Sequence, residues 1–231
     1  MVAQSISFVN GLYREDQRVR LRLNVREAIA HFWYTYDMIT LEEAQRNQEK
    51  LHEDATRLLQ ELRLQELLSK YGELIIEGSY AYGLMHKPDI DLRVINDKPD
   101  KSAIAELTGL LYRIDNVLTV LTMDMHRLKP KDPPKPKGYY IGLKVLFEDL
   151  RWNIDIWVVH EANAGYTPYA SPEEIKKFSD QDKDKILLLK AQLDEAGQDY
   201  NSSRVYRAVV EDKISTVQEF EDWRTQHPAP S

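Results

Sequence analysis

The chain has 231 residues, of which 42% are hydrophobic and 30% are charged, and its formal net charge is −7. This length and apolar content suffice for one sizeable core or two small ones. The chain contains no cysteine, which excludes disulfides, thiolate zinc sites, iron–sulfur clusters and a cysteine nucleophile. Its acidic balance predicts no broad basic surface for nucleic acid.

The sequence shows no sign of membrane insertion or secretion. No apolar run approaches the ~20 residues that a bilayer span requires. The N-terminus lacks the basic start and apolar core of a secretory signal. We therefore expect a cytoplasmic protein that does not contact a membrane.

The first third of the chain is predicted to be helical. It contains no Pro and no Gly over residues 12–71, and we expect two long helices, about 14–38 and 41–71. Thr40, with Glu43 three residues later, forms a capping box for the second. Apolar residues then recur at helical spacing: Leu51, Ala55, Leu58, Leu59, Leu62 and Leu64. Such a stripe is more often core than interface, although a homodimer built on these helices is the alternative.

The middle of the chain alternates between strand and helix patterns. We expect strands, helices and turns in the order strand 73–77, helical turn 79–84, strand 89–95, helix 101–117 and strand 120–128. A loop at 129–138 follows, with four prolines and the lysines Lys129, Lys131, Lys135 and Lys137. Two apolar runs, 139–147 and 151–159, flank a short turn and predict a β-hairpin.

The last part is again helical. We expect helices over about 171–180, 182–196, 202–211 and 215–226, the last two introduced by Asn201 or Ser202 and by Ser215. The sequence therefore predicts an α+β protein. A mixed-sheet core at 72–160 is flanked by an N-terminal helical segment, 1–71, and a C-terminal helical segment, 161–231.

Aspartates stand out in two of the predicted strands. Residues at i and i+2 of a strand share a face, so Asp89 and Asp91 point one way while Ile90 points into the core. In the hairpin strand, Asp155 follows the same pattern. Carboxylates near one another repel and raise each other's pKa, and a divalent cation removes that penalty. An Asp-x-Asp pair alone often just faces water, so the argument depends on what precedes it.

The stretch "GSYAYGLMHKPDID", residues 78–91, resembles the signature of the nucleotidyltransferase superfamily, which includes polymerase beta-like, poly(A) polymerase and antibiotic-type enzymes. That signature is an apolar residue, Gly, then Gly or Ser, a gap of several residues, and Asp, an apolar residue, and Asp or Glu. Here Gly78-Ser79 is followed by nine residues and then Asp89-Ile90-Asp91. Glu77 departs from the pattern, because the family usually has an apolar residue there.

The resemblance implies a nucleotidyltransferase-type core and a set of roles. Gly78 and Ser79 would hold the nucleotide phosphates, and Ser79 is alternatively only a helix N-cap. Asp89, Asp91 and Asp155 would bind two Mg²⁺ ions, with Mn²⁺ as a substitute, and Asp155 would accept a proton. The implied reaction moves a nucleoside monophosphate from a nucleoside triphosphate, with ATP the expected donor, to a hydroxyl, and releases pyrophosphate.

Two further residues enter the prediction. Asp124 is a rival for the third carboxylate, and we prefer Asp155 because its neighbours alternate more cleanly. A hairpin turn centred on residues 149–150 would put Lys144 directly opposite Asp155, where it would contact a phosphate.

Three lysines of the helix predicted over 182–196 are left undecided. Lys183, Lys185 and Lys190 face either solvent or the nucleotide, and the sequence does not decide between these.

The acceptor is expected to be a small molecule or a protein rather than RNA, because the chain is acidic. The alternative is a catalytically silent, antitoxin-like regulator of the same fold that binds a nucleotide or a partner. The presence of all three carboxylates favours the enzyme.

Overall fold

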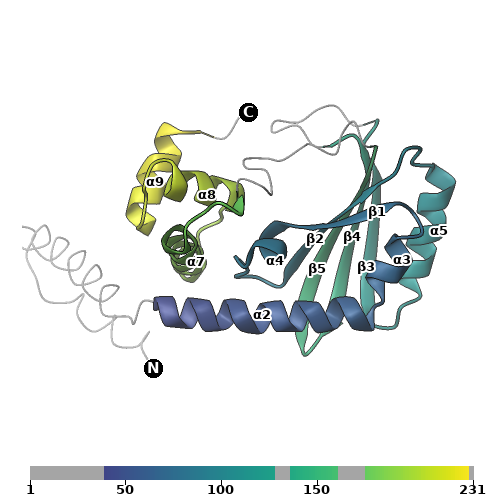
Figure 1. Cartoon of the computed structure of the whole chain (residues 1–231), viewed down its shortest axis with the longest axis horizontal. Helices are drawn as coiled ribbons and strands as arrows, with labels where there is room; N and C mark the ends of the chain where they lie inside the picture. The colour runs from purple at the N-terminus through teal and green to yellow at the C-terminus, as the bar shows by residue number, and fades with distance from the viewer. Residues whose placement is uncertain (1–38, 128–135, 161–174, 229–231) are drawn as a thin grey trace, which may run out of the picture. The chain divides into compact units, whose positions relative to one another are not determined.

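The computed structural model describes residues 39–127, 136–160 and 175–228 (Figure 1). The elements are α2 (Leu41–Glu61), α3 (Leu64–Leu68), β1 (Glu73–Glu77), α4 (Gly78–Tyr82), β2 (Asp89–Ile95), α5 (Lys101–Tyr112), β3 (Val117–Asp124), β4 (Gly138–Phe147), β5 (Leu150–Val159), α7 (Asp180–Glu195), α8 (Ser202–Val210) and α9 (Val217–Gln226). The expected α+β class is confirmed. The helix predicted over 14–38 and most of the lysine loop lie outside the described residues. None of the described helices is long and apolar enough to cross a membrane.

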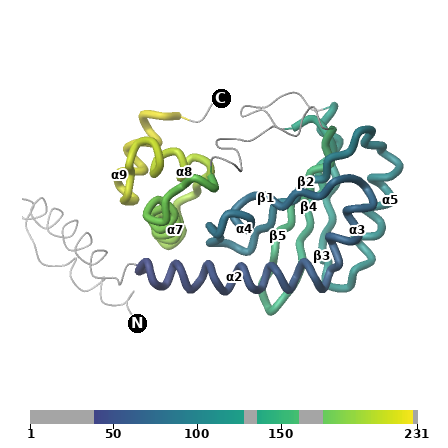
Figure 2. Tube along the Cα trace, in the orientation of Figure 1, coloured from purple at the N-terminus to yellow at the C-terminus, as the bar shows by residue number. Residues whose placement is uncertain are grey.

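The five strands form one mixed sheet in the order β1-β2-β5-β4-β3. Strands β2 and β5 run parallel, and the other neighbours are antiparallel. Strand β5, which comes last of the five in the chain, occupies the middle of this order; its trace is drawn next to that of β4 in Figure 2. This central position places β5 directly beside β2, so the two strands with predicted aspartates are neighbours.

One face of the sheet packs against α2, α3 and α5 and forms the first core. Its largest members include Leu58, Leu64, Ile90, Leu107 and Trp152, all fully buried. The apolar stripe of α2 contributes Leu51, Ala55, Leu58 and Leu62 to this core. Most of the stripe is therefore core, and a homodimer stays a prediction.

A second core joins α7, α8 and α9. Ala44 of α2 and Leu84, which follows α4, are buried in it. Because α2 contributes to both cores, it connects the sheet to the C-terminal helices (Figure 1). The same packing brings α7 close to the beginning of β2, as described below.

Two helix predictions needed correction. The Thr40–Glu43 capping box is present, but the helix expected over 41–71 is broken at Arg63, which adopts a left-handed conformation with φ 51°. The helix expected over 101–117 ends at Tyr112, because Asp115 and Asn116 favour a turn and Val117 already begins β3.

The C-terminal caps also differ in part from the prediction. Asn201 caps α8 as expected. Helix α7 begins after Ser179, which accepts a hydrogen bond from the Asp182 amide. The break expected near residue 181 therefore lies earlier, at residues 176–179. The cap of α9 is Thr216 rather than Ser215; Ser215 instead donates from its amide and hydroxyl to Glu219.

The turn between β4 and β5 lies one residue earlier than predicted, which shifts the pairing register of the two strands by two residues. Glu148 and Asp149 both have positive φ, 49° and 61°, and Phe147 pairs with Leu150. A two-residue turn with two left-handed residues matches the twist of the flanking strands. As a result Lys144 lies opposite Asn153, and the predicted pairing of Lys144 with Asp155 is wrong.

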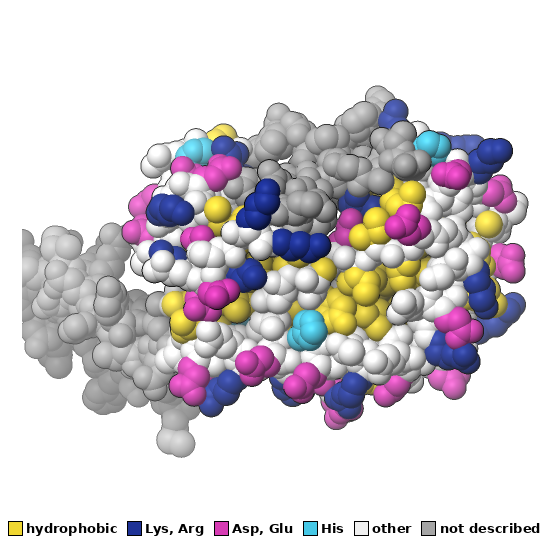
Figure 3. Space-filling model, viewed as in Figure 1, with side chains coloured by type: hydrophobic (Ala, Val, Ile, Leu, Met, Phe, Trp, Pro, Cys, Tyr) yellow, Lys and Arg dark blue, Asp and Glu magenta, His cyan; other side chains and the backbone are white. Residues whose placement is uncertain are grey.

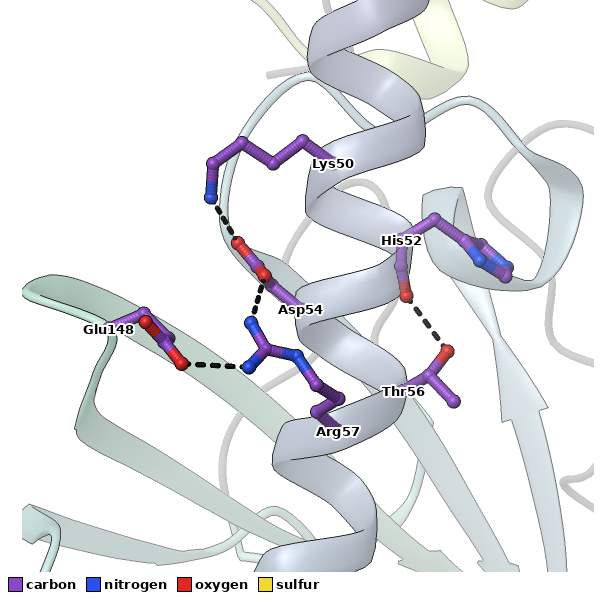
Figure 4. Close-up of polar contacts among 6 residues, drawn as sticks. All are labelled: Lys50, His52, Asp54, Thr56, Arg57 and Glu148. Carbon is purple, nitrogen blue, oxygen red and sulfur yellow. Dashed lines mark hydrogen bonds and ion pairs between the residues drawn. The ribbon is translucent and has the colours of Figure 1, made fainter.

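A buried carboxylate connects α2 to this hairpin (Figure 4). Asp54 is 3% exposed and accepts from Lys50 Nζ and from Arg57 Nη2, both at 2.6 Å. Arg57 Nη1 also contacts Glu148 of the turn at 2.8 Å. Burial raises the pKa of Asp54, but the hydrogen bonds from Lys50 and Arg57 outweigh it, and the net pKa is lowered.

We expect Asp54→Asn to lower the free energy of unfolding by about 1–2 kcal/mol at pH 7, because two charge-assisted hydrogen bonds weaken. Lys50 and Arg57, the partners of Asp54, are more than half exposed, so solvent screening keeps the expected loss of stability small. A lowered pKa stabilises the fold above the unfolded pKa of about 4 and loses that contribution as pH falls. Urea unfolding at pH 7 and pH 3 measures both effects.

The matched control is Glu42→Gln on the same helix. Glu42 is 80% exposed and lies 3.8 Å from Arg46, so its loss should change stability by less than about 0.5 kcal/mol. Equal effects of the two substitutions would contradict a role for Asp54 in holding the hairpin.

Candidate active site

The sheet face opposite the first core carries the candidate site. Direct partners across the strands form a row of Glu77, Asp91, Asp155, Gly142 and Leu121. Neighbouring strands lie about 4.8 Å apart, so three carboxylates occupy adjacent positions. A second row of cross-strand partners lies on the same face, two residues along each strand. It consists of Asp89, Asn153, Lys144 and Thr119.

Asp89, Asp91 and Asp155 are thus brought together on one face. Burial, followed by the Asp155 charge, raises the pKa of Asp89 to about 6. Burial raises the pKa of Asp91 to about 7, with further contributions from Asp89 and Asp155. Such shifts identify a site where negative charge is costly until a cation arrives.

The Gly-Ser turn lies against this cluster. Gly78 has φ +68°, and a Cβ there would lie 1.9 Å from Asp91 Oδ2. Only glycine allows the backbone to approach the carboxylate so closely. Ser79 is the second residue of α4, and the cap position belongs to Glu77. Ser79 is therefore not the N-cap, and phosphate binding by Gly78 and Ser79 stays a prediction.

Lys144 lies next to the aspartate cluster, but opposite Asn153 and not opposite Asp155 as predicted. It is exposed, and its Nζ donates to Asn153 Oδ1 at 2.5 Å. Its charge also lowers the pKa of Asp89. Lys144 therefore shares the face of the aspartates, beside Asp89 rather than opposite Asp155.

Lys190 of α7 is a site residue that the sequence left undecided. It is 3% exposed, and its Nζ donates to the Leu84 carbonyl at 2.6 Å. Burial lowers the pKa of Lys190 to about 8, against the attraction of Asp89 and Asp91. The helical spacing of apolar residues could have predicted that Lys190 faces inward, because Ile186 and Leu193 lie at i−4 and i+3 from it. Both are buried in the structure.

Sequence reasoning also missed two neighbours of the aspartates. Glu77, counted as a departure from the family pattern, lies opposite Asp91 and forms an ion pair with Arg93 at 2.8 Å. Burial raises the pKa of Glu77, and Arg93 opposes that rise. The Tyr140 hydroxyl donates to Asp155 Oδ1 at 2.7 Å.

The rival carboxylate Asp124 lies elsewhere. Its ladder partner is Tyr139, which belongs to the opposite face from Tyr140, and Asp124 Oδ1 contacts His126 at 3.1 Å. Tyr80 of α4 packs against α2, since its hydroxyl lies 3.0 Å from Thr56 Oγ1 and its ring stacks on His52.

The side chains of this cluster are suitable in kind for Mg²⁺. Aspartate oxygens are the donors that Mg²⁺ prefers, and three aspartates on adjacent strands fit it in kind. Within the described ranges no three acidic or histidine side chains already converge on one point. The Asp91 carboxylate lies against Gly78, and Asp155 Oδ1 is bonded to Tyr140. The convergence of the three on metal ions therefore belongs to the proposal below.

A hollow of the described residues lies away from the carboxylates. A groove of about 520 Å³ between α2, α3 and β1 is lined by residues that include Leu59, Leu74, Ile76 and Leu92. Figure 3 shows hydrophobic side chains gathered over this part of the molecule. Leu74 and Ile76 alternate with Ile75 and Glu77 along β1, so the groove opens on the other side of the sheet from the aspartates.

No protein-family model and no curated protein sequence matches this chain. Among solved structures it is similar to the GLD-2/RNP-8 complex, at 12% identity and TM-score 0.46, covering 82% of this chain and 71% of that one. It is also similar to the non-canonical poly(A) polymerase complex GLD-2–GLD-3, at 14% identity and TM-score 0.49, covering 83% and 64%.

The raised pKa values predict an unusual pH dependence of stability. A carboxyl with a folded pKa above its unfolded value costs stability as pH rises from about 4 to about 7. Asp91→Asn removes one such charge and should raise the free energy of unfolding by about 2 kcal/mol at pH 8, with little change at pH 4. Denaturant unfolding at both values measures this.

Asp124→Asn on the same sheet provides a control of opposite sign. Burial raises the pKa of Asp124, but hydrogen bonds from His126 outweigh it and the net pKa is lowered. Its replacement should therefore cost stability at pH 8. An Asp91→Asn protein that is less stable than wild type at pH 8 would contradict the repulsive cluster.

Proposed function

We propose that this chain is a metal-dependent nucleotidyltransferase that moves a nucleoside monophosphate from a nucleoside triphosphate to a hydroxyl group. The observation that carries the proposal is the placement of Asp89, Asp91 and Asp155 on one sheet face, with Gly78 packed against the Asp91 carboxylate. A soluble domain gains nothing in stability from such a cluster, since each added carboxylate raises the pKa of the others. Its chemical use is to bind cations.

In the proposed reaction, the acceptor oxygen forms a bond to the α-phosphorus of the triphosphate. The bond between that phosphorus and the oxygen that bridges to the β-phosphate breaks. Pyrophosphate leaves, and the acceptor proton passes to a carboxylate oxygen of Asp155. Two Mg²⁺ ions, when bound by the three aspartates, supply charge neutralisation and activation of the hydroxyl.

The chain itself contributes position and charge. The Gly78-Ser79 backbone lies against Asp91, and the buried ammonium of Lys190 attracts Asp89 and Asp91; we assign the triphosphate to this part of the cluster. Lys144, tied to Asn153, adds a cation next to Asp89. The acceptor then approaches from the β4 side, in line with the leaving pyrophosphate.

We propose ATP as the donor and a small-molecule or protein hydroxyl as the acceptor. The preference against RNA follows from the net charge of −7, since RNA binding relies on basic surface. The Pro- and Lys-rich segment 129–138 lies largely outside the described residues and enters no part of this proposal.

The first test is calorimetric binding of a non-hydrolysable ATP analogue in Mg²⁺. Wild type should bind with a metal requirement, and Asp89→Asn/Asp91→Asn should lose at least about tenfold in affinity. Asp124→Asn, which changes an aspartate on the opposite face, should bind as wild type does. Transfer is then measured by release of pyrophosphate in the presence of candidate acceptors.

Three outcomes separate the readings. Metal-dependent binding with transfer supports the enzyme. Binding without transfer to any small-molecule, protein or RNA acceptor favours the silent, antitoxin-like regulator. No binding of any of the four nucleoside triphosphate analogues, with Mg²⁺ or Mn²⁺, would overturn both.

Lys190→Met tests the assignment of the triphosphate side. Methionine keeps the length and apolar packing of the lysine stem, so the change removes mainly the charge. We expect about tenfold weaker binding of the ATP analogue, because a buried ammonium is no longer present beside Asp89 and Asp91. Lys185→Met on the same helix is the control, and equal affinity of the two variants would remove Lys190 from the site.

A further inference from the structure

The hydrogen bond between Tyr140 and Asp155 takes an indirect route across the sheet. In the β4–β5 ladder the partner of Tyr140 is Trp157, and the partner of Asp155 is Gly142. The tyrosine hydroxyl nevertheless reaches Asp155 Oδ1 at 2.7 Å. Its side chain must therefore lie along β4 and pass over the position of residue 142.

Gly142 makes that path available. A Cβ at this position would lie 2.5 Å from the Tyr140 hydroxyl oxygen and 3.0 Å from its Cζ. The pairing of β4 with β5 continues through Gly142 without a bulge, so no strand irregularity calls for glycine there. A glycine inside a regular strand marks the close approach of another group, and here that group is the Tyr140 ring.

We propose that Tyr140 is a positioning residue that fixes the Asp155 carboxylate through Oδ1 and leaves Oδ2 for the metal ion and the acceptor proton, with Gly142 as the residue that makes room for it. This inference rests on the proposed function. It divides the two oxygens of Asp155 between a structural and a chemical task.

Electrostatics gives the reason for such a device. Asp155 lies directly beside Asp91, and a free carboxylate would rotate away from its like-charged neighbour. A charge-assisted hydrogen bond holds it in one orientation. The Tyr140 ring is half-buried and lies 5.1 Å from the Trp157 ring.

The test measures the affinity of the full chain for Mn²⁺ by electron paramagnetic resonance, with the ATP analogue present. Tyr140→Phe removes only the hydroxyl, and we expect the affinity for Mn²⁺ to fall about tenfold, as is usual when a group that orients a metal ligand is lost. Tyr139→Phe is the matched control, since it removes the neighbouring hydroxyl from the opposite face. Thermal unfolding of each variant reports whether the fold is intact.

Gly142→Ala provides an independent variant that keeps every hydroxyl and carboxylate. Its methyl group should displace the Tyr140 ring and reduce Mn²⁺ affinity to a similar extent, whereas Gly109→Ala, with no atom within 4 Å of the added Cβ, should bind as wild type does. If Gly142 acts through Tyr140, the double variant Tyr140→Phe/Gly142→Ala loses no more affinity than either single one.

The outcomes distinguish this inference from the proposed function. Wild-type affinity in Tyr140→Phe would overturn the positioning role and leave the nucleotidyltransferase proposal standing. Additive losses in the double variant would overturn the link between Gly142 and Tyr140. A wild-type chain that binds no Mn²⁺ would overturn the proposed function and this inference together.

Discussion

The repulsion among three aspartates on adjacent strands is the constraint on which the rest of the structure depends. Asp89, Asp91 and Asp155 gain nothing from one another, and burial makes the charges of Asp89 and Asp91 still less favourable. The surrounding parts can be understood as responses to that cost. Some lower it directly, as the ammonium of Lys190 does, and others hold a carboxylate where it would not otherwise stay.

Two glycines illustrate the second kind of response. Gly78 lets the backbone before α4 lie against Asp91, and Gly142 lets the Tyr140 ring cross the strand to Asp155. In both cases an absent side chain gives a neighbouring group access to a carboxylate. The glycines have different reasons, because Gly78 also needs a left-handed φ whereas Gly142 only needs space.

The packing of the C-terminal helices explains why the ammonium group of Lys190 lies beside the aspartates. Lys190 is buried on α7 between members of the second core, Leu189 and Ala191, and its ammonium donates to the carbonyl of Leu84, which lies in that core. Helix α2, buried in both cores, connects them. The site therefore depends on parts of the chain about a hundred residues apart, and a change in either core alters the charge balance at the aspartates.

The sequence by itself determined the α+β class, most strands, the Thr40 and Asn201 caps and the identity of the three aspartates, because these follow from local periodicity and capping. It also predicted which face each aspartate occupies, since strand side chains alternate strictly. Only the tertiary structure decided the partners. The turn at residues 148–149 set the register that separated Lys144 from Asp155, and helix packing brought Lys190 to Asp89. Periodicity specifies a face but not what lies opposite it, because pairing is fixed by turn geometry and long-range packing.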